Sequence, residues 1–305
     1  MGVSSHDIFG RASDVHPALP GSYGEAPAGF RLPDQVRLRA VHLQVSDLAR
    51  SEQWYTEVLG LLPTARTSST VALGAAGAVE PLVVLEHRPG TRSVTPGVRL
   101  GLYHFAILLP DRASLGRFVG HLSEIGARAG ASDHLVSEAL YLQDPDGLGI
   151  EVYRDRPRAE WQRSGRELMM ATDPLDFAAV VAAAENERWR GMPAGTVMGH
   201  LHLHVSDLEG ATAFYANALG FDRMVWRYPG ALFLAAGGYH HHLGTNTWAR
   251  GAIPPTDSDA KLLEWQIVTP AAGAALASID AAGFRVDGSI AVDPWGTSVR
   301  LLSSS

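Results

Sequence analysis

The sequence contains no cysteine among its 305 residues. This absence excludes disulfide bonds, thiolate metal ligands and cysteine nucleophiles, although it does not by itself define the cellular compartment. The chain also has no apolar run long enough to span a bilayer, and its first residues lack the apolar core of a secretory signal. We therefore expect a soluble, cytoplasmic protein without a membrane partner.

Positive charge is also scarce. The 25 Lys and Arg residues are outnumbered by 32 Asp and Glu residues, so the net charge is -7, and the cations form no basic run. Such a balance argues against nucleic acid as a partner. Hydrophobic residues make up 46% of the chain, which is enough for one large core or two ordinary cores, and we favour two. A small molecule is the ligand class that remains.

The sequence repeats itself. The tetrapeptide Val-Ser-Asp-Leu at 45–48 recurs at 205–208, an offset of 160 residues that also relates Tyr55 to Tyr215. Each copy has the pattern of a strand, then a helix opened by Ser-Asp, then several short strands. A further copy begins at Gly101, and a fourth, weaker copy contains the segment LLEWQIVTP. Repetition on this scale is a stronger fold signal than local propensity, and it predicts four similar units paired into two domains.

Polar side chains interrupt three of the predicted strands. The stretch 131–153 reads as a strand ending at Leu142, an Asp-Pro-Asp-Gly turn, and a second strand that carries Glu151 among apolar neighbours. Two earlier strands each present one histidine, His42 and His104. Two imidazoles and one carboxylate without an evident fourth ligand are typical of an open-sided divalent metal site. Such a site suits Fe(II) or Mn(II) better than zinc.

These features resemble the vicinal oxygen chelate superfamily, which includes glyoxalases, bleomycin-resistance proteins and type I extradiol dioxygenases. Within it, the chain looks most like the two-domain catechol 2,3-dioxygenase-like ring-cleaving enzymes. The motifs that carry the resemblance are GLYHFAILLP at 101–110, SDHLVSEALYLQDPDGLGIEVYRDRP at 132–157 and GGYHHHLGTNTW at 237–248. The resemblance implies an α+β fold of two domains, each with two paired βαβββ modules that form an open, curled β-barrel with helices outside.

The predicted boundaries follow from the repeat and from composition. Residues 1–35, rich in Gly, Pro, Ser and Ala, are expected to form a mobile N-terminal arm. Residues 36–155 would be the N-terminal domain with the metal site, and residues 197–305 the C-terminal domain. Between them, residues 156–196 would form a connector with a helix that starts near Pro174.

The resemblance implies a function and roles for individual residues. The protein would be an Fe(II)-dependent extradiol ring-cleavage dioxygenase acting on a catechol-type aromatic and dioxygen, with His42, His104 and Glu151 as metal ligands. His134 would shuttle a proton and Tyr141 would hydrogen-bond a reacting oxygen. The sequence equally allows His134 to cap its own loop and Tyr141 to be a core residue with a satisfied hydroxyl.

One departure from the family concerns where the metal set lies. Well-known two-domain extradiol enzymes hold the metal in the C-terminal domain, whereas here the complete set falls in the N-terminal half. In the second half Arg300 replaces Glu151, and an arginine cannot ligate a cation. A second site is left open, made of His202, His241 and Glu264. The alternative for the run 240–242 is a structural role in which the imidazoles bond backbone carbonyls.

Two other functions remain open on the same scaffold. One is a metal-dependent isomerase, lyase or epimerase that works through an enediolate without oxygen. The other is a non-enzymatic protein that sequesters a drug or metabolite. The sequence does not distinguish iron from manganese or define the ring substituents, and it leaves a homo-oligomer open because exposed sheet edges commonly pair.

Overall fold

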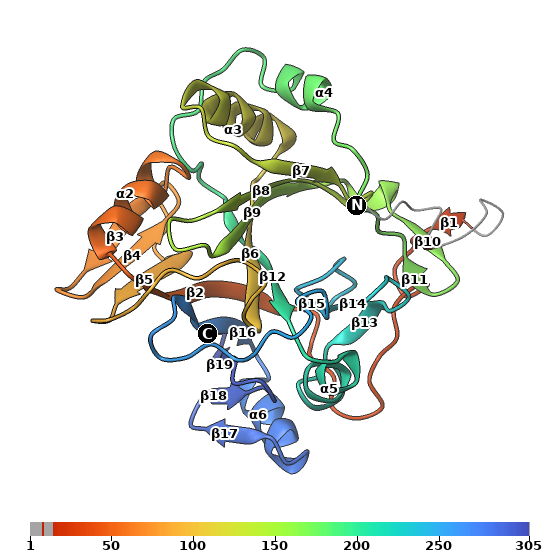
Figure 1. The fold of residues 1–305 in the computed structure, drawn as a ribbon. Coiled ribbons are helices and arrows are strands. Elements are labelled where there is room, and N and C mark those ends of the chain that lie inside the picture. Colours follow the sequence, from red (N-terminus) through yellow and green to blue (C-terminus); the bar gives the residue numbers. More distant parts are fainter. Residues whose placement is uncertain (1–7, 9–14, 305) are drawn as a thin grey trace.

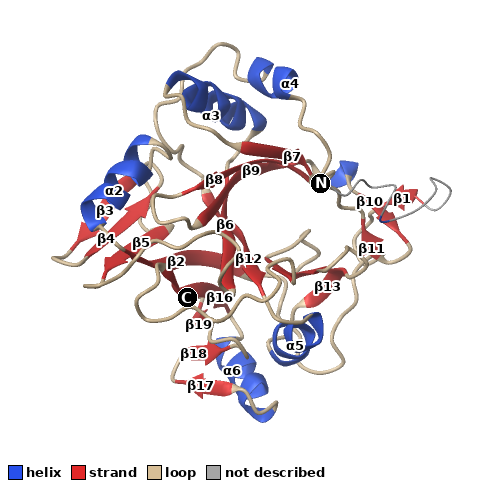
Figure 2. Cartoon of the chain, in the orientation of Figure 1, coloured by secondary structure: helices blue, strands red, loops and turns tan. Residues whose placement is uncertain are grey.

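The computed structural model describes residue 8 and residues 15–304. Two eight-stranded curled sheets dominate the fold, and the helices lie on their outer sides (Figures 1 and 2). The α+β architecture expected from the sequence is therefore confirmed. None of the helices in the described residues is both long and apolar enough to cross a membrane.

All four βαβββ modules are present. The first contains β2 (Arg37–Val45), α2 (Leu48–Glu57), β3 (Leu62–Arg66), β4 (Thr70–Gly74) and β5 (Val83–His87). The second contains β6 (Gly101–Leu108), α3 (Arg112–Glu124), β7 (Gly130–Asp133), β8 (Ser137–Gln143) and β9 (Gly149–Asp155). The third contains β12 (Val197–His204), α5 (Leu208–Ala211) with its continuation η3 (Thr212–Ala218), β13 (Asp222–Val225), β14 (Ala231–Ala235) and β15 (Leu243–Asn246). The fourth contains β16 (Lys261–Thr269), α6 (Ala272–Ala281), β17 (Arg285–Asp287), β18 (Ile290–Val292) and β19 (Ser298–Ser303).

An aspartate begins the helix in three of the modules. Asp47, Asp111 and Asp207 are the N-cap residues of α2, α3 and α5, and each side chain accepts a hydrogen bond from a backbone N–H three residues on. This satisfies a donor that the first helical turn leaves free. In the fourth module Ala271 holds the N-cap position without a side-chain bond. The missing aspartate explains why the fourth copy is the weaker one in the sequence.

The modules pair differently from the prediction. The first strand of the second module, β6, lies antiparallel to β12 of the third, and β2 of the first module lies antiparallel to β16 of the fourth. Each sheet therefore takes one module from each half of the chain, so residues 36–155 and 197–305 are not separate barrels. Neighbouring modules pair often but not always, and a repeat reveals the module without saying which strand edges meet.

The segment before β2 also differs from the prediction. In this segment β1 (Val15–Pro17) pairs with β10 (Gln162–Ser164), which in turn pairs with β11 (Glu167–Leu168). Leu32 is buried in the main core, and the Arg31 guanidinium lies 2.6 Å from the Asp222 carboxylate. Residues 15–35 thus pack against the rest of the protein through long-range contacts that composition does not reveal. The remainder of the expected arm, residues 1–7 and 9–14, lies outside the described residues.

The connector has the expected helix in a short form. It contains η2 (Arg158–Glu160) and, after β11, α4 (Phe177–Ala182), which Asp176 caps. This helix packs closely on α3, since a Cβ at Gly116 would lie 2.3 Å from the Val180 carbonyl oxygen. The connector therefore covers the second module.

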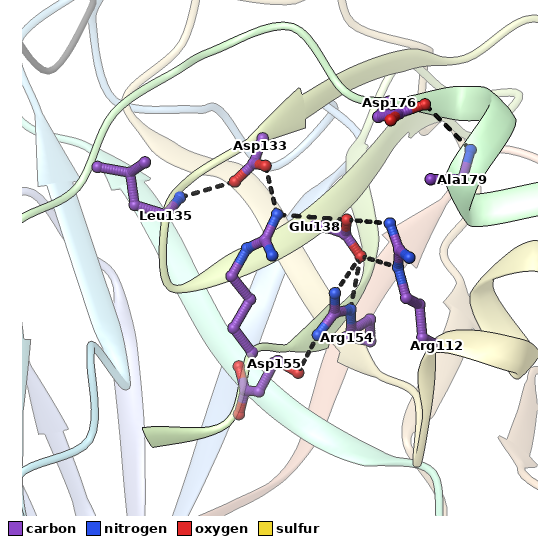
Figure 3. Close-up of polar contacts among 9 residues, drawn as sticks. Arg112, Asp133, Leu135, Glu138, Arg154, Asp155, Asp176 and Ala179 are labelled. Atoms are coloured by element: carbon purple, nitrogen blue, oxygen red, sulfur yellow. Dashed lines mark hydrogen bonds and ion pairs between the residues drawn. The ribbon is translucent and has the colours of Figure 1, made fainter. Parts of the chain in front are cut away.

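A buried carboxylate ties the second module together. Glu138 of β8 accepts hydrogen bonds from Arg112, at the start of α3, at 2.8 Å and from Arg154, on β9, at 2.6 Å (Figure 3). Burial would raise the pKa of Glu138, but the bonds to Arg112 and Arg154 outweigh it and lower that pKa. Because β9 also carries Glu151, this network holds in place a strand that matters for the site described below.

Substituting Glu138 should therefore destabilise the protein in a pH-dependent way. Glu138→Gln leaves the arginines without their charged partner, so we expect the free energy of unfolding to fall by about 3 kcal/mol at pH 7. A depressed folded-state pKa contributes stability above the ordinary carboxyl pKa and loses it on acidification, so the two proteins should converge as the pH falls toward 3. Denaturant unfolding from pH 7 to 3 measures this.

The matched control is Glu124→Gln at the exposed end of α3, where the nearest cation, Arg188, is 3.9 Å away. It should leave stability within about 0.5 kcal/mol of the wild type. A loss for Glu138→Gln that is independent of pH would contradict the electrostatic explanation.

Candidate metal and substrate site

One cluster of side chains in the described residues has the spacing of a metal site. The nearest ligand atoms of His104, Glu151 and His200 all lie within 4.8 Å of one another, and all three residues are buried. They come from β6, β9 and β12, which are neighbouring strands at the centre of one sheet. The Nε2 atoms of His104 and His200 lie 3.0 Å and 3.2 Å from the same oxygen of Glu151.

The protonation states of the cluster are those that a metal requires. Burial lowers the pKa of both His104 and His200, although the nearby carboxylate of Glu151 opposes this shift in each case. Burial would raise the pKa of Glu151, but His200 and His104 outweigh it and hold that pKa well below its ordinary value. Neutral imidazoles and an ionised carboxylate are the forms that bind a divalent cation.

Several polar atoms of the cluster lack a hydrogen-bond partner. Glu151 Oε1 and His104 Nε2 are buried without one, because the contact between His104 and Glu151 is not aligned as a hydrogen bond. A buried charged group without a partner is costly, and a cation would remove that cost. Two imidazoles and one carboxylate with open positions suit Fe(II) or Mn(II). The residues present therefore fit the expected metal.

The prediction that His42 joins this set is wrong. His42 lies on β2 in the other sheet, opposite Glu264 of β16, and its Nε2 is 2.9 Å from the Glu86 carboxylate. The place expected for His42 is taken by His200, which comes from the second half of the chain. His104 and Glu151 do lie together as expected.

The N-cap aspartates provide the signal that sequence analysis missed. His104 and His200 each lie seven residues before the aspartate that caps the following helix, at Asp111 and Asp207. The residue seven positions before the cap Asp47 is Ala40. Counting back from the cap therefore selects His200, whereas the 160-residue repeat relates His42 to His202.

The second site left open by the sequence does not form. Glu264 lies in the other sheet, where the Arg300 guanidinium is 2.6 Å from its carboxylate. His202 lies opposite His104 with the ring centroids 5.0 Å apart, and the His241 ring is 4.0 Å from that of His200. His202 and His241 thus belong to the surroundings of the first cluster.

A cavity of about 590 Å³ opens onto this cluster. His104, Glu151, His202 and His241 are part of its wall. The other residues that line it come from β6, β7, β8, the connector and the segments around β14 and β15: Tyr103, Gly130, Ala131, Ser132, His134, Tyr141, Met170, Ala171, Thr172, Tyr228, Pro229, Phe233 and Trp248. The two residues predicted to be catalytic, His134 and Tyr141, therefore face the same space as the cluster.

His134 and Tyr141 are bonded to each other. The Nδ1 atom of His134 is 2.6 Å from the carbonyl oxygen of Ala171, which can only accept, so Nδ1 carries the proton. The other ring nitrogen, Nε2, then accepts from the Tyr141 hydroxyl. Burial, with the negative charge of Glu151, raises the pKa of Tyr141 well above its ordinary value, so that the hydroxyl keeps its proton at neutral pH.

A second hydrogen-bonded pair at the site consists of His241 and His240. The Nδ1 atoms of His241 and His240 are 2.7 Å apart, and His240 Nε2 is 2.7 Å from the Asp155 carboxylate. The carboxylate accepts from His240 Nε2, so with neutral rings His241 donates from Nδ1 and presents Nε2 without a proton. Burial lowers the pKa of His241 well below its ordinary value. The triplet 240–242 is visible in the sequence, but its partner Asp155 is not.

Comparison with known proteins agrees with this architecture. The family model of the Glyoxalase/Bleomycin resistance protein/Dioxygenase superfamily matches residues 37–152 and 197–301. The chain belongs to this superfamily.

Among individual relatives, it is 47% identical over 234 residues to the catechol-2,3-dioxygenase of Bacillus subtilis (strain 168), a match that covers 74% of this chain and 80% of the relative. Solved structures with a similar fold include glyoxalase I from Zea mays, with a TM-score of 0.52, 19% identity and coverage of 88% of this chain and 93% of that one. A putative dioxygenase from Bacillus subtilis subsp. subtilis str. 168 has a TM-score of 0.56, 11% identity and coverage of 88% and 86%. At these identities the structures show the fold alone.

Metal binding distinguishes the two histidines directly. We expect wild-type protein to bind one Mn(II) or Fe(II) per chain and His200→Ala to bind it more than about 100-fold more weakly, because a direct ligand is lost. His42→Ala should bind like the wild type. Equilibrium dialysis with metal analysis measures both, and loss of metal in His42→Ala with retention in His200→Ala would overturn the assignment.

Proposed function

We propose that this protein is an Fe(II)-dependent extradiol dioxygenase that opens the ring of a catechol-type aromatic beside its two adjacent hydroxyl groups. The observation that carries the proposal is the convergence of His104, His200 and Glu151 at a cavity. His104 and Glu151 line this cavity together with His134, Tyr141 and His241. The similarity to a catechol-2,3-dioxygenase supports the same activity. His104, Glu151 and His200 would hold the iron, which would supply Lewis-acid and one-electron chemistry for the reaction of a catechol with dioxygen; Mn(II) accepts the same donors.

The cavity can bind and orient an aromatic ring. Tyr103, Phe233 and Trp248 place aromatic faces along its wall, and the Tyr103 and Trp248 rings meet edge to face with centroids 5.8 Å apart. Rings of this kind pack favourably on a planar substrate. The buried position of the three metal-binding side chains keeps the reacting end of the substrate away from bulk water.

His241 is positioned to take a proton from the substrate. Its Nε2 is the acceptor nitrogen, because Nδ1 is used in the bond to His240, which Asp155 orients in turn. A catechol must lose hydroxyl protons to bind a cation with both oxygens, and a neutral imidazole at the cavity wall is a suitable base. His240 and Asp155 act through His241 as positioning residues.

His134 and Tyr141 form the second proton-handling pair. Because the Tyr141 hydroxyl is held at the acceptor nitrogen of His134, a proton that reaches Tyr141 can move on to His134. The pair lies on β8 and the turn before it, whereas His241 lies just before β15. Two proton-handling groups from different modules therefore face one cavity, which suits a reaction that removes and returns protons at different positions.

Turnover tests the proposal. Aerobic protein loaded with Fe(II) should convert catechol to a yellow ring-opened semialdehyde and consume one dioxygen per ring, because both oxygen atoms enter the product. An oxygen electrode and the visible absorbance measure the two quantities together. Conversion of a substrate without oxygen consumption would favour the isomerase or lyase alternative instead.

The role of His134 has a separate test. His134→Gln removes the proton acceptor beside Tyr141, so we expect kcat to fall by about 100-fold or more while the bound metal stays at the wild-type level. His121→Gln is the matched control, since His121 is on α3 and is not part of the cavity wall. Unchanged kcat in His134→Gln would contradict the assigned role.

A further inference from the structure

The size and lining of the cavity indicate which substituent the catechol ring carries. This inference rests on the proposed function, since it takes the substrate to be a catechol held at the cluster of His104, His200 and Glu151. The volume of about 590 Å³ is in the range of pockets that enclose drug-sized ligands, and a single unsubstituted ring would leave much of it unfilled. The part of the cavity that the ring leaves unfilled must therefore accommodate the ring's substituent.

The wall offers no partner for a negatively charged substituent. Among the described residues that line the cavity, none is Lys or Arg, and the carboxylate in the wall is Glu151. Arg154 of β9 and Arg156, the first residue of the connector, form ion pairs with Glu138 and Asp133. A carboxylate on the substrate would lose its hydration without gaining a cation, which is unfavourable.

Two polar groups of the outer wall are bonded within the protein. The Tyr228 hydroxyl is 2.7 Å from the Thr172 hydroxyl, and the Trp248 indole N–H donates to the carbonyl oxygen of Pro229 at 2.9 Å. These rings therefore present their apolar surfaces to the cavity. Met170 and Phe233 add further apolar surface to the same wall.

The large side chains at the edge of this wall remain partly exposed. Tyr103 and Trp248 are 38% and 43% accessible, although both line the cavity and their rings meet. Apolar side chains that border a cavity and stay exposed are commonly covered by a ligand. An apolar group that extends outward from the reacting ring would reach them.

We propose that the natural substrate is a catechol with an uncharged, apolar substituent such as an alkyl chain or a second ring, and that the cavity selects against catechols bearing a carboxylate. The selection comes from the missing cation and from the apolar surfaces of the wall. The substituent packs against Tyr103, Tyr228, Phe233 and Trp248.

A matched pair of substrates tests the proposal with the Fe(II)-loaded protein. 4-Propylcatechol and 3,4-dihydroxyphenylacetate have side chains of similar size, but the second is charged. We expect kcat/KM to favour 4-propylcatechol by about 100-fold or more, and anaerobic titration of the metal-loaded protein to show the same order of affinities. Equal values for the pair would overturn the inference while leaving the ring-cleaving function intact.

The anaerobic titration tests the inference independently of the proposed function. If every catechol, including the unsubstituted one, failed to consume oxygen, the proposed function would fail, and the anaerobic affinities would still decide whether the cavity prefers the neutral member of the pair.

A pair of variants tests the cause of the preference. Thr172→Lys places an ammonium group in the wall, and Thr172→Met loses the same bond to Tyr228 without adding charge. We expect Thr172→Lys to narrow the preference by about tenfold or more, chiefly through stronger binding of the acetate, whereas Thr172→Met should retain it. A preference that is the same in both variants would show that the missing cation is not its cause.

Discussion

The antiparallel pairing of β6 with β12 is the interaction on which the rest of the structure depends. These strands belong to the second and third modules, and their register places His202 opposite His104 and His200 opposite Ala106. Because side chains alternate across a strand, His200, His202 and His104 face the same side of the sheet. The adjacent β9 then brings Glu151 to them. Both halves of the chain are therefore needed for one set of ligand atoms.

The other sheet shows what the same scaffold does without such a set. In that sheet Arg300 of β19 lies beside Gln266 of β16, just as Glu151 of β9 lies beside Ala106 of β6. Glu264 lies two residues before Gln266 and therefore occupies the position that His104 has in the first sheet. The Glu264 carboxylate and the Arg300 guanidinium satisfy each other at 2.6 Å. The guanidinium of Arg300 thus provides the positive charge beside Glu264, whereas the corresponding residues of the first sheet could bind a metal ion. Both sheets retain the duplicated architecture. At the two equivalent positions, one sheet has the Glu264–Arg300 ion pair and the other has His104 and Glu151 of the candidate metal site.

The surroundings of the site combine residues from distant parts of the sequence. His134 is oriented by the carbonyl of Ala171 in the connector, and His241 is oriented through His240 by Asp155 at the end of β9. The connector between the two halves of the chain is therefore part of the cavity wall. Orientation by hydrogen bonds of this kind fixes which nitrogen of each histidine carries its proton.

The sequence by itself determined the modules and most of the residues proposed for the site. Repetition of Val-Ser-Asp-Leu and the N-cap aspartates define strand, helix and strands locally, because capping and periodicity depend on residues a few positions apart. His104, Glu151, His134 and Tyr141 were identified because all four lie within one module. Only the tertiary structure decided that His200 replaces His42, that Asp155 supports His241, and that residues 15–35 pack against the third module. These depend on which strand edges meet, and that choice is made by packing between residues 49 to 191 positions apart in the chain, which no local pattern encodes.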